Sequence, residues 1–175
     1  MIQVEKLGRY FGHFAALTEV SFNVEPGQIV GLLGLNGAGK STTLKCLAGL
    51  MAPSSGTITI DGVNIINATP ALRKKIGFLP EAPPLYKDMT VGDFIVHVGQ
   101  LKGMTASDAR KRLPEVVKLT HLEGWEDRLI STLSHGYQKR VGIAQTIIHN
   151  PSLVILDEPI SGLDPAQIVE MRDVI

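Results

Sequence analysis

The alternation of apolar and polar residues predicts a strand-rich first third of the chain. Residues 20–24 alternate with a period of two, which is typical of a strand buried on one face. Residues 57–65 alternate on both sides of an Asp61-Gly62 pair and therefore predict a hairpin. Residues 29–33 form a continuous apolar run instead, so we expect a strand that is buried on both faces.

Helical spacing of the apolar residues replaces this alternation farther along the chain. We predict helices over residues 40–50, after the capping residues Thr90 and Ser107, and over residues 134–148. The helix after Thr90 has a predicted apolar face made of Phe94, Ile95, Val98 and Leu101. Short apolar runs at residues 76–79 and 153–156 predict further strands. This order of elements favours an α/β core with an inserted helical region.

Composition narrows the class of protein. The chain has 175 residues, enough for one domain of ordinary size, with 44% hydrophobic and 19% charged residues, as in globular proteins. Basic and acidic residues number 17 each, so we expect no nucleic acid as a partner. The single cysteine, Cys46, lies in a largely apolar run, and we interpret it as a buried small hydrophobe rather than a reactive thiol.

The N-terminal residues do not have the layout of a signal peptide, and no apolar run approaches the about 18 residues that a membrane helix needs. We therefore expect a cytoplasmic protein. If this protein works as a peripheral subunit on the inner face of the cell membrane, another polypeptide supplies the membrane spans.

A glycine-rich loop follows the apolar run at residues 29–33 and matches the pattern Gly-x-x-x-x-Gly-Lys-Ser. Glycines in such a loop let backbone N–H groups point at phosphate oxygens, and the next helix directs its positive end at the same phosphates. Lys40 would contact the β- and γ-phosphates, and the Ser41 hydroxyl would bind Mg²⁺. The alternative is a glycine-rich turn without a ligand. We predict that ATP and Mg²⁺ bind through Gly34, Leu35, Asn36, Gly37, Ala38, Gly39, Lys40, Ser41 and Thr42.

An acidic pair follows the apolar run at residues 153–156. If that run is a strand, Asp157 and Glu158 emerge at its carboxyl end, the edge at which ligands bind in open α/β sheets. Asp157 would bind Mg²⁺, and Glu158 would orient the attacking water or accept its proton. A strand that simply leaves the core gives the same pattern, but together with the phosphate-binding loop the pair predicts a site of ATP hydrolysis.

A motif at residues 133–138 indicates which kind of nucleotide hydrolase this is. The GTPase motifs Asp-x-x-Gly and Asn-Lys-x-Asp are absent from the sequence. The segment Leu-Ser-His-Gly-Tyr-Gln resembles instead the signature motif of ATP-binding-cassette (ABC) ATPases, usually Leu-Ser-Gly-Gly-Gln. It departs from that motif at His135 and Tyr137 but keeps Ser134 and Gly136, which contact phosphate in the family. The alternative is that Ser134 is a plain helix cap.

Other segments are similar to the same family. Residues 161–164 resemble its D-loop, and residues 53–62 resemble part of its β-subdomain. Phe11 resembles the aromatic residue that stacks on adenine, with Tyr10 as the second choice and a core aromatic as the alternative. The resemblance covers essentially the whole chain. It implies a P-loop NTPase (RecA-like) α/β core with an antiparallel β-subdomain and an inserted helical subdomain.

The chain also departs from the family pattern. Glu81 stands where the family has a glutamine, and its carboxylate would bind Mg²⁺ or serve mainly to contact a partner. No histidine of the chain occupies the place of the family's switch histidine. We therefore expect an incomplete ABC domain, with core and β-subdomain over about residues 1–80 and 151–175 and helical subdomain over about residues 85–150.

The resemblance also implies partners. In ABC ATPases the P-loop of one subunit and the signature motif of another enclose each ATP, so Lys40 and Glu158 would act in catalysis with Ser134 and Gly136 of a second subunit. Residues 79–98 would contact an integral membrane permease. The sequence of this region looks most like that of the ATPase subunits of bacterial ABC-2-type exporters. We expect ATP-driven dimerisation that powers transport. The alternatives are a soluble ABC-type ATPase acting on nucleic acid or the ribosome, or, for this fragment, a nucleotide-binding module with little turnover.

Overall fold

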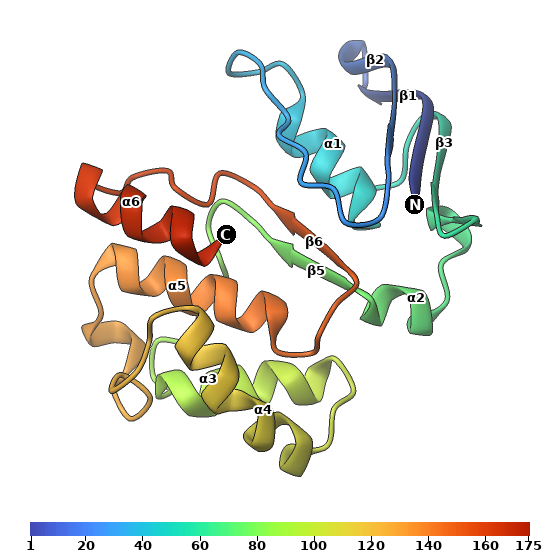
Figure 1. Cartoon of the computed structure of the whole chain (residues 1–175). Helices are drawn as coiled ribbons and strands as arrows, with labels where there is room; N and C mark the ends of the chain where they lie inside the picture. Colours follow the sequence, from blue (N-terminus) through green and yellow to red (C-terminus); the bar gives the residue numbers. More distant parts are fainter. The chain divides into compact units, whose positions relative to one another are not determined.

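The computed structural model describes residues 1–175, and the chain divides into two compact units (Figure 1). The first unit is Met1–Arg73 and the second is Lys74–Ile175. The first carries the predicted phosphate-binding loop, and the second carries the acidic pair and the motif that starts at Leu133.

The first unit is built on a four-stranded antiparallel sheet of order β2-β1-β3-β4. Its strands are β1 (Ile2–Phe11), β2 (Phe14–Val24), β3 (Ser55–Ile60) and β4 (Val63–Asn64). The unit also contains α1 (Lys40–Leu47), the short 3-10 helix η1 (Ile65–Asn67) and all but the last residue of α2 (Pro70–Lys74). Its buried apolar side chains include Val4, Leu7, Leu17, Cys46 and Ile58. Burial raises the pKa of the Cys46 thiol, so Cys46 is the buried hydrophobe that we expected.

The predicted hairpin forms where its turn residues require it. Asp61 and Gly62 have φ of 50° and 77°, the left-handed conformation that a two-residue hairpin turn needs at both central positions. Ile60 then pairs with Val63. Glycine accepts this conformation without strain, so the Asp-Gly pair is a sufficient local signal.

The predicted strand at residues 29–33 does not form. These residues pair with no strand of either sheet, and Ile29 and Leu33 are 90% and 93% exposed. A strand buried on both faces needs a parallel neighbour at its edge and helices over its faces. Strands β1 to β4 form an antiparallel sheet that provides neither. The expectation was wrong because hydrophobicity alone does not supply a strand's partners.

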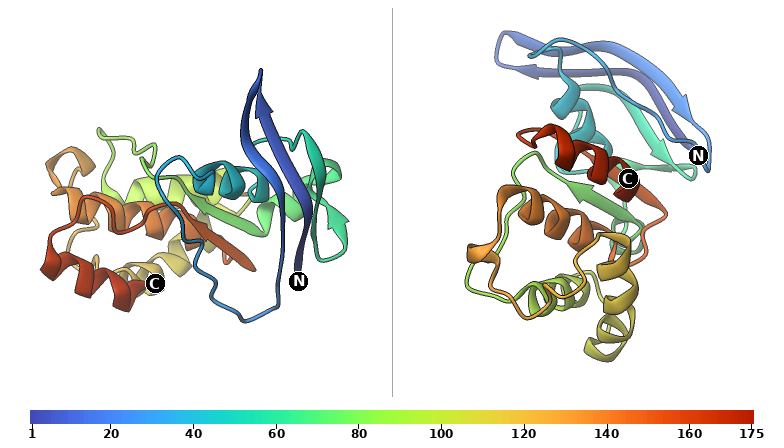
Figure 2. Two further views of the ribbon diagram at one scale, coloured as in Figure 1. Left: turned by 90° about the horizontal axis from the view of Figure 1, so that it is seen from above. Right: turned by 60° about the vertical axis from the view of Figure 1, so that its left-hand side comes forward.

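The second unit combines a short parallel sheet with helices. Strands β5 (Ile76–Leu79) and β6 (Leu153–Leu156) pair in parallel. The helices are α3 (Val91–Leu101), α4 (Ala106–Leu119), α5 (His135–Ile147) and α6 (Pro165–Val174), with the 3-10 helix η2 (Ile130–Thr132) before α5. Figure 2 shows α5 beside the strand pair, with α3 and α4 farther from it. In β6, Ile155 is buried, whereas Val154 is 43% exposed.

The helices α3, α4 and α5 share one hydrophobic core. Their buried side chains form a single cluster together with three residues of the connecting segments, Leu122, Ile130 and Leu133. The other members are Val91, Phe94, Ile95, Val116, Val117, Val141, Ala144 and Ile148. The predicted apolar face of α3 is correct for its first turns. Leu101, however, is the last residue of α3 and is 68% exposed.

The predicted caps of α3 and α4 have different outcomes. Thr90 caps α3, as expected, by accepting a hydrogen bond from the Asp93 N–H. Ser107 does not cap α4. Thr105 does so, accepting from the Asp108 N–H at 3.1 Å and donating to the Asp108 carboxylate at 2.7 Å. This reciprocal pair satisfies a free N–H of the first turn and fixes where the helix starts.

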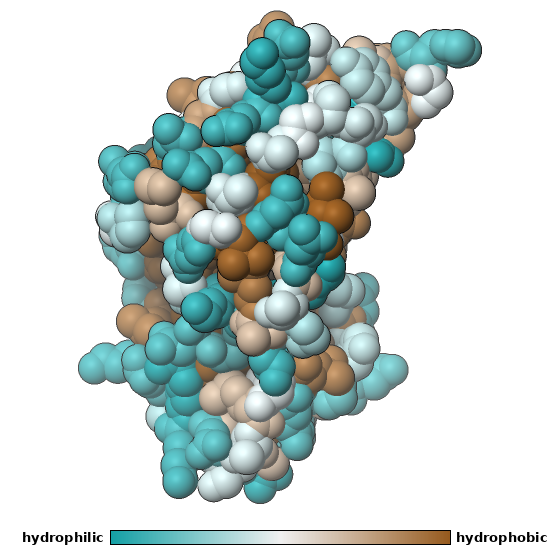
Figure 3. Space-filling model, turned by 90° about the vertical axis from the view of Figure 1, so that its right-hand side faces the viewer, coloured by the Kyte–Doolittle hydropathy of each residue, from teal (hydrophilic) through white to brown (hydrophobic).

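No helix of the structure combines the length and the apolar character that crossing a membrane requires. The face drawn in Figure 3 mixes polar and apolar side chains without one continuous apolar surface.

Candidate functional sites of the two units

The predicted phosphate-binding loop is exposed from Gly34 to Ala38. Gly37 and Gly39 have φ of 82° and 86°, which L side chains rarely adopt. A Cβ on Gly39 would also lie 2.5 Å from the Ala16 carbonyl oxygen and 2.4 Å from a methyl of Leu17. Position 39 therefore requires glycine both for its conformation and for space.

Lys40 and the start of α1 place positive charge at this loop. The Lys40 ammonium donates to the carbonyl oxygens of Gly34 and Leu35 at 3.0 and 3.1 Å. Helix α1 begins at Lys40, and no side chain caps its first turn. Backbone N–H groups at an uncapped helix start and an ammonium beside them are suited to an anion such as a phosphate. Ser41 and Thr42 lie in the same turn.

Phe11 stands at the tip of the β1–β2 hairpin, opposite Phe14 in the strand register. It is 46% exposed, and the Arg9 guanidinium lies 4.9 Å from the centre of its ring. Tyr10 is exposed to a similar degree. The alternative that Phe11 is a core aromatic is therefore wrong, and the exposed ring is accessible for stacking.

The acidic pair lies at the carboxyl edge of the β5–β6 sheet, as expected. Leu79 pairs with Leu156, and the Asp157 N–H donates to the Leu79 carbonyl at 2.9 Å, which aligns the ends of the two strands. Asp157 is buried, whereas Glu158 is exposed and has φ of 51°. The sequence thus places a fixed carboxyl and an accessible carboxyl next to each other.

Glu81 follows β5 at the same edge, because the strand register aligns the residues after Leu79 with those after Leu156. Its side chain is exposed. No group of three or more His, Cys, Asp or Glu side chains is gathered closely enough to hold a metal ion alone. In phosphate-binding loops a hydroxyl, a carboxylate and the phosphates share the metal, so no such cluster is expected. Whether Glu81 binds Mg²⁺ stays a prediction.

The residues at the start of α5 differ in how exposed they are. Ser134 is the capping residue, and its hydroxyl accepts from the Tyr137 N–H at 3.5 Å, which is long for a hydrogen bond. Ser134 and His135 are exposed, whereas Gly136 is buried beside the end of the Gln167 side chain, which would have to shift to admit a Cβ. The plain helix cap is therefore real, but its weak hydrogen bond leaves the Ser134 hydroxyl accessible.

The residues that depart from the signature motif have structural partners. The Tyr137 ring packs against Trp125, tilted by 33° with 4.2 Å between ring centres, and the Arg140 guanidinium lies over the Tyr137 ring at 5.1 Å from its centre. Arg140 also forms an ion pair with Glu170 and donates to the His121 carbonyl. Tyr137 thus packs the start of α5 against Trp125 and Arg140.

The segment that resembles a D-loop lies next to the start of α5. Asp164 caps α6 by accepting from the Gln167 N–H at 2.9 Å, and Pro165 occupies the first turn. Gly162 has φ of 75°, and a Cβ there would lie 3.2 Å from the His135 ring. His135 therefore contacts the D-loop segment of its own chain.

One residue with a close relation to the acidic edge was not predicted. Lys139, in α5, is only 2% exposed, and its ammonium donates to the carbonyl oxygens of Glu81 and Glu158. The available signal was a lysine within a helix whose residues 139–146 are all buried. Such a charge needs partners, and the sequence does not say which.

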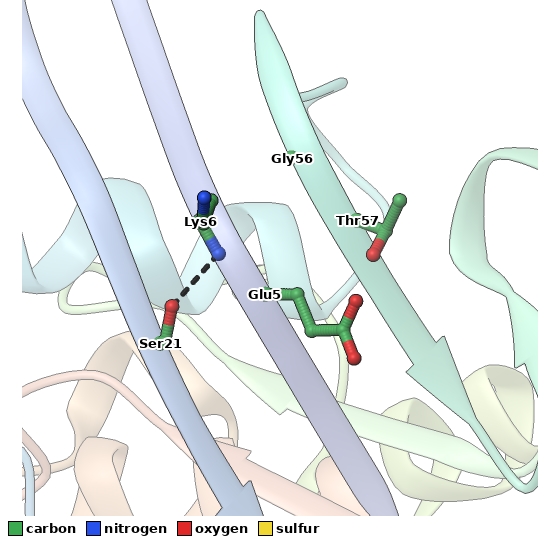
Figure 4. A pocket seen from close by; sticks show the side chains of 5 residues that line it. All are labelled: Glu5, Lys6, Ser21, Gly56 and Thr57. Atoms are coloured by element: carbon green, nitrogen blue, oxygen red, sulfur yellow. Dashed lines mark hydrogen bonds between the residues drawn. The ribbon is translucent and has the colours of Figure 1, made fainter.

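A shallow pocket in the first unit is unrelated to these residues. It is lined by Glu5, Lys6, Ser21, Gly56 and Thr57 and is drawn in Figure 4. The Lys6 N–H donates to the Ser21 hydroxyl there at 2.8 Å. None of the five was predicted to be a site residue, and the pocket follows from the irregular pairing of β1 around Lys6.

Comparison with known proteins identifies the family. Residues 17–161, most of the chain, match the family profile described as ABC transporter. The chain belongs to the ABC transporter family. This confirms the family inferred from the segment at residues 133–138.

Relatives of this ABC domain carry consistent names. It is 38% identical over its whole length to the uncharacterized ABC transporter ATP-binding protein YxlF of Bacillus subtilis, of which it covers 58%. It is 40% identical over 99% of its length to the uncharacterized ABC transporter ATP-binding protein MJ1023 of Methanocaldococcus jannaschii, of which it covers 62%. A Nod factor export ATP-binding protein I of Paraburkholderia xenovorans is 37% identical over 94% of the chain, which covers 54% of it. The chain thus spans little more than half the length of these relatives.

Solved structures confirm the ABC ATPase fold. An ATP binding subunit of an ABC transporter matches with a TM-score of 0.85 and 32% identity, over 99% of this chain and 72% of that one. The ATP-binding cassette MJ0796, solved as a dimer in a post-hydrolysis state bound to ADP and Pi, matches with a TM-score of 0.87 and 27% identity, over 99% of this chain and 81% of that one. The predicted fold class, a P-loop NTPase core with an antiparallel β-subdomain and a helical subdomain, is therefore correct.

Proposed function

We propose that the protein containing this ABC domain binds and hydrolyses ATP and thereby powers transport through partner membrane subunits. The observation that carries the proposal is the form of the phosphate-binding loop. Its left-handed glycines, the Lys40 ammonium and the uncapped start of α1 leave a positively polarised, exposed loop. Such a loop suits the triphosphate of a nucleotide.

The residues of each unit have separate roles in this proposal. In the first unit, the loop from Gly34 to Ser41 holds the phosphates, Lys40 balances their charge, and the Phe11 ring stacks on the base. In the second unit, Glu158 orients the attacking water and takes up its proton. The exposed Glu158 carboxylate and its fixed neighbour Asp157 support this division of work.

The donor set also suits a magnesium ion. The Ser41 hydroxyl and the Asp157 carboxylate are hard oxygen ligands of the kind that Mg²⁺ prefers, and Glu81 is a further candidate. When bound, Mg²⁺ would neutralise negative charge that develops on the phosphates. The burial of Asp157 at a strand end holds its carboxylate in one place, which supports its assignment as a ligand.

The partners in this proposal are a second copy of the ATPase and an integral membrane permease. Ser134 and Gly136 would complete the site of the other copy, and residues 79–98 would contact the permease. The exposed Ser134 at the start of α5 and the dimeric state of MJ0796 support the first partner. The export named for one relative supports the second. The protein would then lie at the inner face of the cell membrane.

ATP-driven dimerisation of the full-length protein tests this proposal. Glu158→Gln keeps the shape of the side chain but removes the base, so this variant is expected to bind ATP and remain a dimer. Light scattering with ATP, with ADP and without nucleotide measures the mass. Lys40→Met is the matched control and is expected to stay monomeric with ATP. A Glu158→Gln variant that retains full ATP turnover would contradict the proposal.

A further inference from the structure

Lys139 is a buried lysine that no predicted site includes. It lies in α5, one turn after the capping Ser134, and is 2% exposed. Its ammonium donates to the Glu81 carbonyl oxygen at 2.5 Å and to the Glu158 carbonyl oxygen at 3.5 Å. A buried ammonium is costly unless hydrogen bonds replace its water, so these bonds restrict where both carbonyl groups lie.

The two acceptors belong to the loops that leave the paired strands. Glu81 follows β5 and Glu158 follows β6, and the strands are in register up to Leu79 and Leu156. Beyond those residues the strand ladder extends only through the Asp157 N–H, which donates to Leu79. Lys139 hydrogen-bonds to both loops just beyond the point where the pairing of the strands ends, and so links them there.

The backbone of Glu158 is in an uncommon conformation. Its φ of 51° is left-handed, a conformation that residues other than glycine rarely adopt. Its carbonyl accepts from the Ser161 N–H at 3.2 Å and, over a longer 3.5 Å, from the Lys139 ammonium, so two donors of unequal strength face this one peptide group. A backbone fixed in this way sets the direction in which the Glu158 side chain leaves it.

We propose that Lys139 is a positioning residue for the Glu158 carboxylate. By holding the carbonyl groups of Glu81 and Glu158 together, it keeps Glu158 in the conformation that directs its carboxylate at the attacking water. It touches neither the nucleotide nor the water. This role rests on the proposed function of Glu158 in ATP hydrolysis.

Steady-state kinetics of full-length Lys139→Met provide the test. Methionine fills the space of the lysine stem but donates no hydrogen bond. We expect kcat for ATP to fall about 10- to 100-fold, the effect of a slightly misplaced catalytic group, with the Kd for ATP changed less than twofold. Lys139→Gln can still donate to a carbonyl and is expected to recover part of the loss.

Lys102→Met is the matched control. The Lys102 ammonium also donates to a backbone carbonyl, that of Ile76, at 3.3 Å, but at the opposite end of β5 from Glu81. Its loss should leave kcat within about twofold of the unmodified protein while removing a similar hydrogen bond. Thermal unfolding of both variants separates an effect on stability from an effect on kcat.

The outcomes separate this role from the proposed function. A kcat that is equal in Lys139→Met and Lys102→Met, in a protein whose turnover depends on Glu158, overturns the role of Lys139 alone. An unmodified protein without turnover overturns both. If Lys139→Met does not fold, Lys139→Leu, which also donates no hydrogen bond, decides: a lowered kcat with unchanged Kd supports the role, and a kcat equal to that of Lys102→Met overturns it.

Discussion

The phosphate-binding loop and the acidic edge are built in opposite ways. The loop is one continuous segment, in which Lys40 hydrogen-bonds residues only five and six positions before it. The acidic edge joins separate segments, because Lys139 reaches carbonyl groups 58 and 19 positions away. The loop is therefore determined by local residue types, and the edge by the packing of α5 on the strand pair.

This difference predicts how each region fails. A change within the loop removes a contact with phosphate and should affect nucleotide binding. A change at the edge alters the direction of a side chain and should affect turnover while binding persists. The variants below compare the two regions, beginning with the largest effect.

Lys40→Met and Glu158→Gln should separate binding from turnover most strongly. Loss of the Lys40 ammonium removes a charged contact worth about 1.5–3 kcal/mol, so ATP should bind about 10- to 100-fold more weakly. Loss of the Glu158 base should lower kcat about 100- to 10,000-fold with little change in ATP affinity. Titration calorimetry and steady-state kinetics measure the two effects. Weak ATP binding by Glu158→Gln would contradict the assignment of binding to the loop and of turnover to the acidic edge.

Gly39→Ala should damage the loop through its backbone. The left-handed φ of 86° costs roughly 1–3 kcal/mol for alanine, and the new Cβ would meet the Ala16 carbonyl oxygen at 2.5 Å. We expect a lowered melting temperature together with loss of ATP binding. Gly37→Ala is the control, because Gly37 has a similar φ of 82° but no atom near its Cβ position. Equal losses in the two variants would show that the close contact is unimportant.

The same contrast between local and distant contacts explains which parts of the two regions could be predicted from the sequence. The glycine-rich loop, the Asp61-Gly62 turn and the Thr90 cap depend on neighbours in the chain, and each forms as expected. The Thr105 cap could also have been found, because Thr105 and Asp108 repeat the spacing of Thr90 and Asp93. Choosing Ser107 ignored a local signal that was present.

The failures concern partners that are distant in sequence. Residues 29–33 have the hydrophobicity of a buried strand, but the sheet of the first unit offers them no place. The role of Lys139 depends on carbonyl groups that any residue carries, so no residue type marks them in advance. Hydrophobic patterns predict what a segment can do, and only tertiary packing decides whether its partners are present.

Phe11→Ala should weaken ATP binding moderately if the ring stacks on adenine. Removing one aromatic stack costs about 1 kcal/mol at its lower limit, which corresponds to roughly a fivefold increase in the Kd for ATP. Phe14→Ala is the control, because Phe14 faces Phe11 across the hairpin and is even more exposed. Calorimetry with ATP and GTP measures both variants. A larger loss for Phe14→Ala or for Tyr10→Ala would move the stacking role to that residue.

The free energy of unfolding should depend weakly on pH through His149, in the second unit. Burial, followed by the charge of Lys102, lowers the pKa of His149 to about 4 from 6.5, and the ring lies against the Ile76 carbonyl. The unfolded chain therefore binds a proton at His149 below about pH 6.5, whereas the folded chain does not, so stability falls as the pH drops toward 4. Because His149 is only half-buried, we expect a loss on the order of 1 kcal/mol by pH 5. Urea unfolding should show a smaller loss for His149→Gln, and an identical loss would contradict this.

Mixing two inactive variants of the full-length protein tests most directly whether the phosphate-binding loop of one copy and the start of α5 of the other act together on ATP across a dimer. Lys40→Met lacks a working phosphate-binding loop, and Ser134→Arg blocks the start of α5. Each alone should show little ATP turnover. A mixed dimer contains one site in which both regions are intact, so we predict that mixing restores a substantial part of the turnover. A mixture that remains as inactive as its components would contradict the composite site.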